Sequence, residues 1–261
     1  MKALYIASTG MSAQEHNVEV ISNNIANMRT TGFKKQRAEF QDLLYQAYRR
    51  SGSSTSDQGT VVPAGIEIGS GVKTAATPRI MSQGTVTPTE KELDVAVRGE
   101  GFFQIQLPDG RTAYTRDGSF ERDSSGQLVN VDGYQVQPGI VIPDNSTSIS
   151  ISSDGMVEVF LGSESTPTQI GQIQLTRFVN KAGLESLGDN LFVETGASGS
   201  PQTGVPASDG MGNLQQGYLE MANVNAVTEI ADLIAAQRAY EMNARVISGA
   251  DEMMSATSQL R

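Results

Sequence analysis

The chain has 261 residues, no cysteine, a formal net charge of −10 and a pI of about 4.6. This length permits one large or two modest domains that fold without disulfides, and the lack of cysteine excludes thiol catalysis and cysteine-ligated metal. So acidic a chain is not expected to bind nucleic acid or an anionic membrane as its main partner. No apolar run is long enough for direct membrane insertion. Residues 1–50 nevertheless carry seven Lys or Arg against four Asp or Glu, so the acidic excess belongs to the rest of the chain.

The N-terminal residues predict a long helix with a narrow apolar seam. Residues suited to such a seam recur in steps of three and four, at Leu4, Ala7, Met11, Gln14, Val18, Ile21, Ile25 and Met28. We expect the helix to end near Thr30, Thr31 and Gly32, because glycine can take a left-handed cap. Polar residues break the apolar stretch at positions 8–10, so we expect no cleavable secretory signal.

The next segment predicts a short helix followed by a linker. Phe40, Leu43, Leu44, Ala47 and Tyr48 have the spacing of one helical face, so we expect a helical turn or two there. The polar tract over residues 51–59 has the composition of a flexible linker. We assign residues 45–81 to a linker or insertion segment that is extended or β.

The middle of the chain predicts an antiparallel β domain over residues 82–195. Short runs of apolar residues with a period of two are separated by Asp-Gly turns at residues 108–110, 116–118, 131–133 and 153–155. Asp-Gly tolerates the positive φ angles of tight hairpins. We expect residues 196–221, which open with a Gly- and Ser-rich stretch, to be a return linker.

The C-terminal residues predict a second long helix with apolar residues on two of its sides. One row comprises Ile230, Leu233, Gln237, Tyr240, Ala244, Ile247, Asp251 and Met254. A second row comprises Ala235, Ala239, Met242, Val246, Gly249 and Met253. The rows lie well over a third of a turn apart, so one partner helix cannot bury both.

These elements together predict an α+β fold with paired, coiled-coil-like terminal helices and a β domain between them. Residues 1–44 and 222–261 would form a discontinuous helical domain that orders on assembly, since polar residues dilute both seams. An antiparallel helix pair that caps a monomer remains an alternative. The candidate subunit-interface residues are Leu4, Met11, Val18, Ile21, Ile25, Met28, Ile230, Leu233, Tyr240, Met242, Val246, Ile247 and Met253.

The sequence offers no convincing catalytic, cofactor or metal site. The single histidine, His16, has neither a cysteine nor a second histidine to act with, so no nucleophilic triad or zinc motif can be written. Glu90, Glu92 and Asp94 are carboxylates of the kind that a glycosidase needs, although a solvated loop explains them as well. The alternative function is therefore a β-rich module that binds or hydrolyses cell-wall glycans.

Several spaced motifs resemble the axial proteins of the bacterial flagellum, the rod and hook family. The N-terminal motif is Ile21-Ser-Asn-Asn-Ile-Ala-Asn27 with Thr30-Thr-Gly-Phe-Lys34, and the C-terminal one is Asn223-Val-Asn225 with Gln237-Arg-Ala-Tyr-Glu241 and Asn243. Between them, Leu93–Val97, Gly101–Gln104 and Tyr114–Phe120 resemble the β domain of that family. The chain length and the tract from Tyr45 to Pro63 are most similar to the distal-rod members, with proximal-rod and hook components as the nearer alternatives.

The resemblance implies a structural protein without enzymatic activity. It implies copies of the chain that pack through their terminal helices into a hollow helical tube, a drive shaft that transmits torque from motor to hook. It also implies export without a cleavable signal, a place in the basal body from the periplasm to the outer membrane, and a tract at 45–63 that wedges between subunits. The implied partners are proximal rod proteins, the hook protein, and the surrounding P-ring and L-ring proteins.

Overall fold

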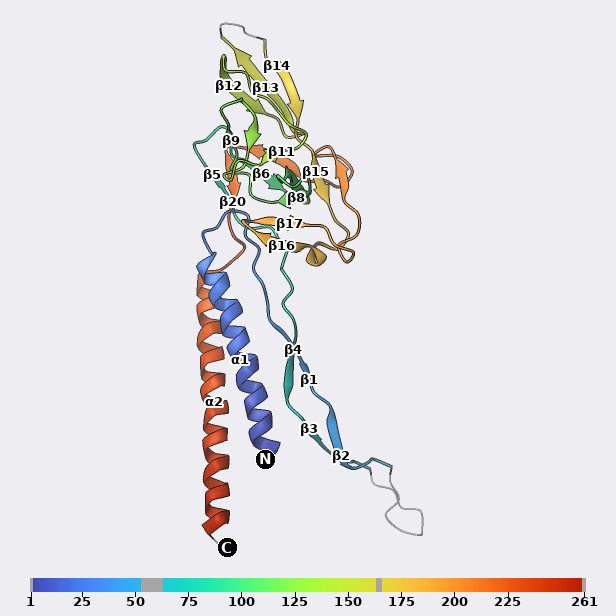
Figure 1. Cartoon of the computed structure of the whole chain (residues 1–261), viewed down its shortest axis with the longest axis vertical. Helices are drawn as coiled ribbons and strands as arrows, with labels where there is room; N and C mark the ends of the chain where they lie inside the picture. The colour runs from blue at the N-terminus through green and yellow to red at the C-terminus, as the bar shows by residue number, and fades with distance from the viewer. Residues whose placement is uncertain (1, 53–62, 163–165, 260–261) are drawn as a thin grey trace. The chain divides into compact units, whose positions relative to one another are not determined.

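The computed structural model describes residues 2–52, 63–162 and 166–259, and its fold is α+β as the sequence predicts (Figure 1). The chain divides into two compact units. Residues 1–25, 36–78 and 225–261 form what we call the helix–arm unit, and residues 26–35 and 79–224 form the β body. Most of the polar tract expected as a linker at 51–59 lies outside the described residues.

The helix–arm unit contains two long antiparallel helices, α1 (Lys2–Ala26) and α2 (Ala226–Gln259), which lie side by side in Figure 1. Asn225 caps α2, because its side-chain oxygen accepts hydrogen bonds from the backbone N–H groups of Val227 and Thr228 at 3.0 and 3.3 Å. Helix α1 ends at Ala26, earlier than the end near Gly32 that the sequence predicts. Residues 27–33 form turns instead, and residues 26–35 belong to the β body.

An antiparallel arm follows α1 where the sequence analysis expects a helix. Strand β1 (Glu39–Asp42) pairs with β4 (Val72–Ala76), and β2 (Tyr45–Arg49) pairs with β3 (Ile66–Gly69). The helix expected over 40–48 is therefore wrong. Its pattern covers only nine residues, too few for periodicity to separate helix from strand, and pairing with a segment farther along the chain decides the outcome.

The β body is built from short antiparallel strands. Its described residues include a nine-stranded sheet formed by β7 (Phe102–Gln106), β8 (Thr112–Thr115), β9 (Glu121–Arg122), β10 (Leu128–Val129), β11 (Gln135–Val136), β15 (Leu175–Arg177), β16 (Glu185–Gly188), β17 (Leu191–Val193) and β18 (Gln202–Gly204). A three-stranded sheet contains β12 (Ser146–Ile151), β13 (Met156–Leu161) and β14 (Thr168–Gln172). Two further pairs are β5 (Val86–Pro88) with β20 (Tyr218–Glu220) and β6 (Val95–Arg98) with β19 (Asn213–Gln216), and a short 3-10 helix spans Lys181–Gly183. Strands β18 to β20 fall within the segment expected to be a return linker.

Three of the four Asp-Gly turns close hairpins as predicted. Gly110, Gly133 and Gly155 have φ angles of +84°, +82° and +84° and connect β7 to β8, β10 to β11 and β12 to β13. The turn at residues 116–118 is different, since β8 and β9 pair with other strands among the described residues. Gly118 instead allows its backbone to lie close to that of Val95, because a Cβ there would lie 1.7 Å from the carbonyl oxygen of Val95. The hairpin expected at this turn is wrong.

The core of the β body joins both larger sheets. Its buried residues include Phe103 and Phe120, whose rings meet edge to face with centroids 5.0 Å apart. A smaller aromatic cluster surrounds Phe102, Tyr114 and Phe178. Both clusters include a residue of β8, the strand that directly precedes Arg116.

Candidate assembly site

Small and polar side chains meet at two places along the seam between α1 and α2. A Cβ on Gly10 would lie 2.9 Å from Asn243 Nδ2, so the helices approach closely there. Farther along, Asn24 Nδ2 donates a hydrogen bond of 3.1 Å to Glu229 Oε2. The step from Gly10 to Asn24 equals the step from Asn243 back to Glu229, which defines one antiparallel register.

Asn24 also fixes the chain that follows the helix. Its Nδ2 donates to the carbonyl of Gln36 and its Oδ1 accepts from the N–H of Gln36, both at 2.9 Å. Asn24 is 2% exposed and Glu229 is 4% exposed. The interface set from the sequence omits both residues, because a search for apolar periodicity passes over polar side chains.

The six N-terminal interface candidates, five of them on α1, differ in how far their side chains are exposed. Ile21 is buried at 6% exposure, and Met28, just beyond α1, is 38% exposed. Leu4, Met11, Val18 and Ile25 are half-buried. The latter four share a face of α1 adjacent to the row that contains Gly10 and Asn24.

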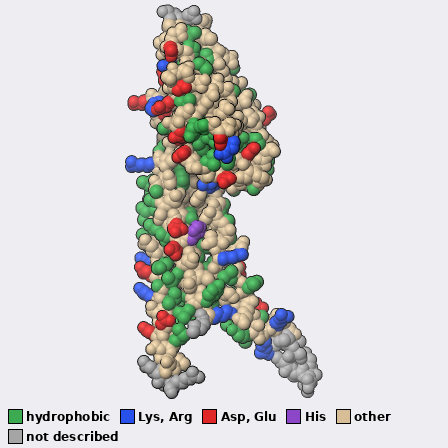
Figure 2. Space-filling model, in the orientation of Figure 1, with side chains coloured by type: hydrophobic (Ala, Val, Ile, Leu, Met, Phe, Trp, Pro, Cys, Tyr) green, Lys and Arg blue, Asp and Glu red, His purple; other side chains and the backbone are tan. Residues whose placement is uncertain are grey.

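The candidates on α2 lie mostly at the surface, and Figure 2 shows hydrophobic side chains in view along the helix–arm unit. Leu233 and Ile247 are half-buried. The remaining five are 40 to 67% exposed: Ile230 48%, Tyr240 40%, Met242 61%, Val246 51% and Met253 67%. The buried positions on α2 are instead occupied by Glu229, Ala236 and Ala250. Within the described part of the chain, most of the larger apolar side chains of this helix are therefore exposed.

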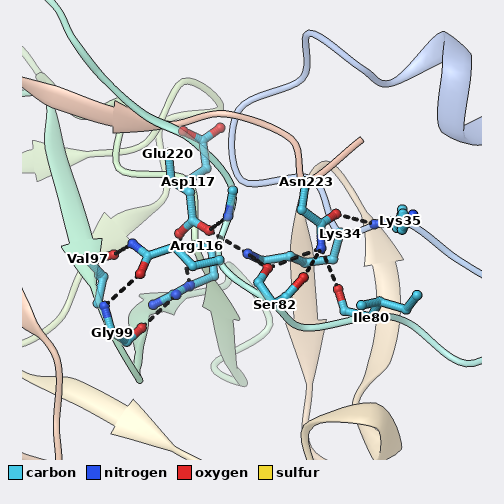
Figure 3. Close-up of polar contacts among 12 residues, drawn as sticks. Lys34, Lys35, Ile80, Ser82, Val97, Gly99, Arg116, Asp117, Glu220 and Asn223 are labelled. Carbon is cyan, nitrogen blue, oxygen red and sulfur yellow. Dashed lines mark hydrogen bonds and ion pairs between the residues drawn. The ribbon is translucent and has the colours of Figure 1, made fainter. Parts of the chain in front are cut away.

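A buried ionic cluster, which we call the joint, lies within the β body (Figure 3). Lys34 Nζ donates to Glu220 Oε1 at 2.5 Å, and Arg116 Nε lies 3.2 Å from Glu220 Oε2. The side chains of Lys34, Arg116 and Glu220 are 1%, 5% and 0% exposed. Burial lowers the pKa of Lys34, against the opposing effect of the Glu220 carboxylate, and burial likewise lowers the pKa of Arg116.

Backbone groups complete the joint. Glu220 Oε1 accepts from the N–H of Gly84 at 2.8 Å, and Lys34 Nζ also donates to the carbonyl of Ser82 at 2.9 Å. The Arg116 guanidinium donates to the carbonyls of Gly99 and Gly101 at 2.8 and 2.7 Å. These bonds compensate much of the cost of removing the charges from water.

The joint connects the segment after α1 to the segment before α2. The N–H of Gly32 donates to the carbonyl of Glu220 at 2.7 Å, and the N–H of Lys35 donates to Asn223 Oδ1 at 2.8 Å. Asn223 Nδ2 in turn donates to the carbonyls of Ile80 and Ser82 (Figure 3). Gly32 has φ +69°, and a Cβ there would lie 2.8 Å from a backbone nitrogen, so this crossing requires glycine.

The three carboxylates at residues 90–94 differ in their exposure to solvent. Glu90 and Glu92 are exposed, whereas Asp94 is 3% exposed and its backbone pairs with Ser119. Glu92 borders an open groove of about 550 Å³ whose wall includes an ion pair between Lys91 and Glu121 at 3.4 Å.

The single histidine lies beside a carboxylate on its own helix. His16 lies 3.3 Å from Glu19 on the surface of α1. Among the described residues there is no cluster of three or more side chains able to hold a metal ion. Of the helices that the structure describes, none is both long and apolar enough to cross a membrane.

Comparison with protein families gives matches near both ends and in the β body. Residues 4–34 match the model for a flagella basal body rod protein, residues 96–159 match the D1 domain of flagellar hook protein FlgE/F/G, and residues 215–260 match the C-terminal model of the flagellar basal body rod FlgEFG proteins. These ranges include the joint and both helices in large part.

Full-length relatives agree with these matches. The chain is 57% identical to the flagellar basal-body rod protein FlgG of Caulobacter vibrioides over 261 residues, which is 100% of both chains. It is 48% identical to FlgG of Borreliella burgdorferi over 263 residues, covering 100% of this chain and 99% of that one. Identity to FlgG of Bacillus subtilis is 37% over 259 residues, 97% of each chain. The chain therefore belongs to the FlgG family of flagellar basal-body rod proteins, and it is a structural subunit of the distal rod rather than an enzyme.

Proposed function

We propose that copies of this chain polymerise through α1 and α2 into a hollow helical shaft that transmits torque from motor to hook. The observation that carries the proposal is the exposure of large apolar side chains on α2, including Met242 at 61% and Met253 at 67%. Exposed apolar surface of this extent on a helix is typical of an interaction site. Because α1 covers a different face, the exposed residues are available to neighbouring subunits.

The exposed residues on α2 support contacts with more than one neighbour. Val227, Ile230 and Ile234 occupy one side of the first part of the helix. Met242, Val246 and Met253 occupy another side of its later part. In this proposal each subunit places the two groups against different copies, and the half-buried row on α1 with Leu4, Met11, Val18 and Ile25 adds to these contacts.

The arm supports a further contact between copies. Leu44 is 88% exposed and Tyr48 is 61% exposed, although a two-stranded arm is only marginally stable alone in water. Lys2 of α1 donates to Gln46 Oε1 at 2.9 Å and lies 5.6 Å from the centroid of the Tyr48 ring. We assign residues 45–81 to an insertion segment whose tract at 45–63 wedges between subunits. Residues 1–44 with 222–261 are assigned to the helical assembly domain, and 82–195 to the outward β domain.

The partners beyond this chain follow from the same proposal. The shaft would join proximal rod proteins at one end and the hook protein at the other, and would turn inside the P-ring and L-ring proteins. It would extend from the periplasm to the outer membrane. The acidic chain, with a net charge of −10, suits a hydrated surface that does not adhere to a surrounding ring.

The test compares one substitution at two exposed valines. Val246 on α2 is 51% exposed and Val131 in the β body is 71% exposed. Val246→Ser is expected to raise the concentration at which the purified chain forms tubes, measured by sedimentation and electron microscopy. Val131→Ser is expected to assemble as the unsubstituted chain does. Equal assembly of both variants would contradict the proposal.

A further inference from the structure

The joint contains buried charges that neither the fold nor the subunit contacts described above require. Lys34, Arg116 and Glu220 come from three distant parts of the sequence, and Lys34 and Glu220 alone are 186 residues apart. A buried ionic group is costly unless a partner and hydrogen bonds satisfy it, and apolar side chains of similar size often stabilise a protein as well or better. Stability alone therefore does not account for the buried charges of the joint.

The geometry of the joint makes Glu220 its central residue. The carboxylate binds Lys34 through one oxygen and faces Arg116 with the other, while its backbone carbonyl accepts from Gly32. Glu220 is also the last residue of β20, six positions before α2 begins. One residue thus contacts the segment that leaves α1 and stands in the segment that enters α2 (Figure 3).

Charged hydrogen bonds restrict geometry more than apolar contacts do. Lys34 donates to Glu220 and to the carbonyl of Ser82. Arg116 forms an ion pair with Glu220 and donates to the carbonyls of Gly99 and Gly101. Each hydrogen bond requires a defined length and direction. A shift of either segment therefore breaks bonds to a buried charge. Apolar side chains at the same place would keep similar contacts if the two segments slid past each other.

We propose that Glu220 is a positioning residue for rod assembly: it holds residues 30–35 and 220–223 as one rigid connection, so that the chain enters α2 beside the point where it left α1. Its effect on assembly rests on the function proposed above for the terminal helices. Its effect on the two segments does not, and can be measured in the unassembled chain.

The primary experiment is hydrogen exchange on the dilute full-length chain carrying Glu220→Gln. The variant leaves two buried cations without their anion, so exchange in residues 30–35 and 220–223 should accelerate roughly a hundredfold. The amides of β7, which lie in the core of the β body, should keep their protection. Glu121→Gln removes the carboxylate of an ion pair whose side chains are 60 to 66% exposed, and this matched control should leave exchange unchanged.

A second variant separates charge pairing from a general loss of structure. Adding Lys34→Met to Glu220→Gln removes one unpaired cation, so the double variant should exchange more slowly in both segments than Glu220→Gln alone. Asn223→Ala removes the side-chain bonds to Lys35, Ile80 and Ser82 without altering charge, and should accelerate exchange in the same segments roughly tenfold. It provides the same local readout if Glu220→Gln does not fold.

The outcomes distinguish this inference from the proposed function. Unchanged exchange in the two segments of the Glu220→Gln and Asn223→Ala chains would overturn the positioning role, as would an equal loss of protection in β7. Local loosening together with normal tube formation would overturn the role of the joint in assembly. Normal tubes from Val246→Ser would overturn the proposed function alone, because the exchange results do not depend on tube formation.

Discussion

Replacing Ile230 by alanine should weaken assembly while leaving the single subunit folded. Full burial of an isoleucine side chain contributes about 1.5 to 3 kcal/mol. Ile230 remains 48% exposed in the subunit, so roughly half of this contribution, about 1 kcal/mol, is still to be gained on assembly. Its loss should raise the concentration needed for tube formation roughly fivefold, as measured by sedimentation across a dilution series.

Ile21→Ala is the matched control, because the same substitution there removes a side chain that is 6% exposed within the subunit. It should destabilise the helix pair itself by about 2 to 5 kcal/mol, seen as a loss of helical circular dichroism at lower temperature. Ile230→Ala should leave that transition nearly unchanged. An unchanged assembly concentration for Ile230→Ala, or equal thermal destabilisation by both variants, would refute the assignment of Ile230 to a subunit interface.

Gly32→Ala should destabilise the β body, because the added Cβ would meet the backbone nitrogen of Asp117 at 2.8 Å with φ at +69°; thermal unfolding measures the loss. Phe103→Ala should lower the free energy of unfolding of the β body by about 3 to 5 kcal/mol in urea titrations, since Phe103 is fully buried in its core. The Ser125 hydroxyl and nearby backbone N–H groups lower the pKa of Asp123 below 3.8, so this carboxylate contributes stability above that pH and loses it as the pH falls through the folded-state pKa. The stability lost on acidification, followed by fluorescence or NMR, should be smaller in Asp123→Asn than in the unsubstituted chain.

Each of these predictions has a control within the chain. Gly52 has φ +78°, and among the described residues beyond its chain neighbours no heavy atom lies within 4 Å of an added Cβ, so Gly52→Ala isolates backbone strain from the close contact at Gly32. Equal losses in the two glycine variants would show that the contact is unimportant. Val131→Ala, at a residue 71% exposed, should leave the urea midpoint unchanged where Phe103→Ala lowers it. An identical acid transition in Asp123→Asn would contradict the assigned role of that carboxylate.

Local sequence patterns predict the elements whose signals repeat over many residues. The three-four spacing predicts α1 and α2, and Asp-Gly predicts three hairpins whose glycines have positive φ. The pattern over residues 40–48 fails because it is short, and because β2 acquires its partner strand from residues 66–69. The resemblance to the rod and hook family rests on motifs spread along the whole chain, and the full-length relatives confirm it.

The joint illustrates what local patterns cannot predict. Lys34 reads as one of several basic residues after a helix, Arg116 as part of a turn, and Glu220 as an acidic residue in a linker. Their burial follows from contacts between segments up to 186 residues apart, which no spacing rule records. Motifs that contain Lys34 and Arg116 indicate the family, but the structure is needed to show that they meet.

The same arrangement determines how the chain would carry a mechanical load. A pull on the segment from α1 against the segment to α2 meets the bonds from Gly32 to Glu220 and from Lys35 to Asn223 before it reaches the strands between them. Tension would thus pass directly across the joint. The two larger sheets of the β body contribute no residue to these two bonds, so they can remain intact while the terminal segments are under strain.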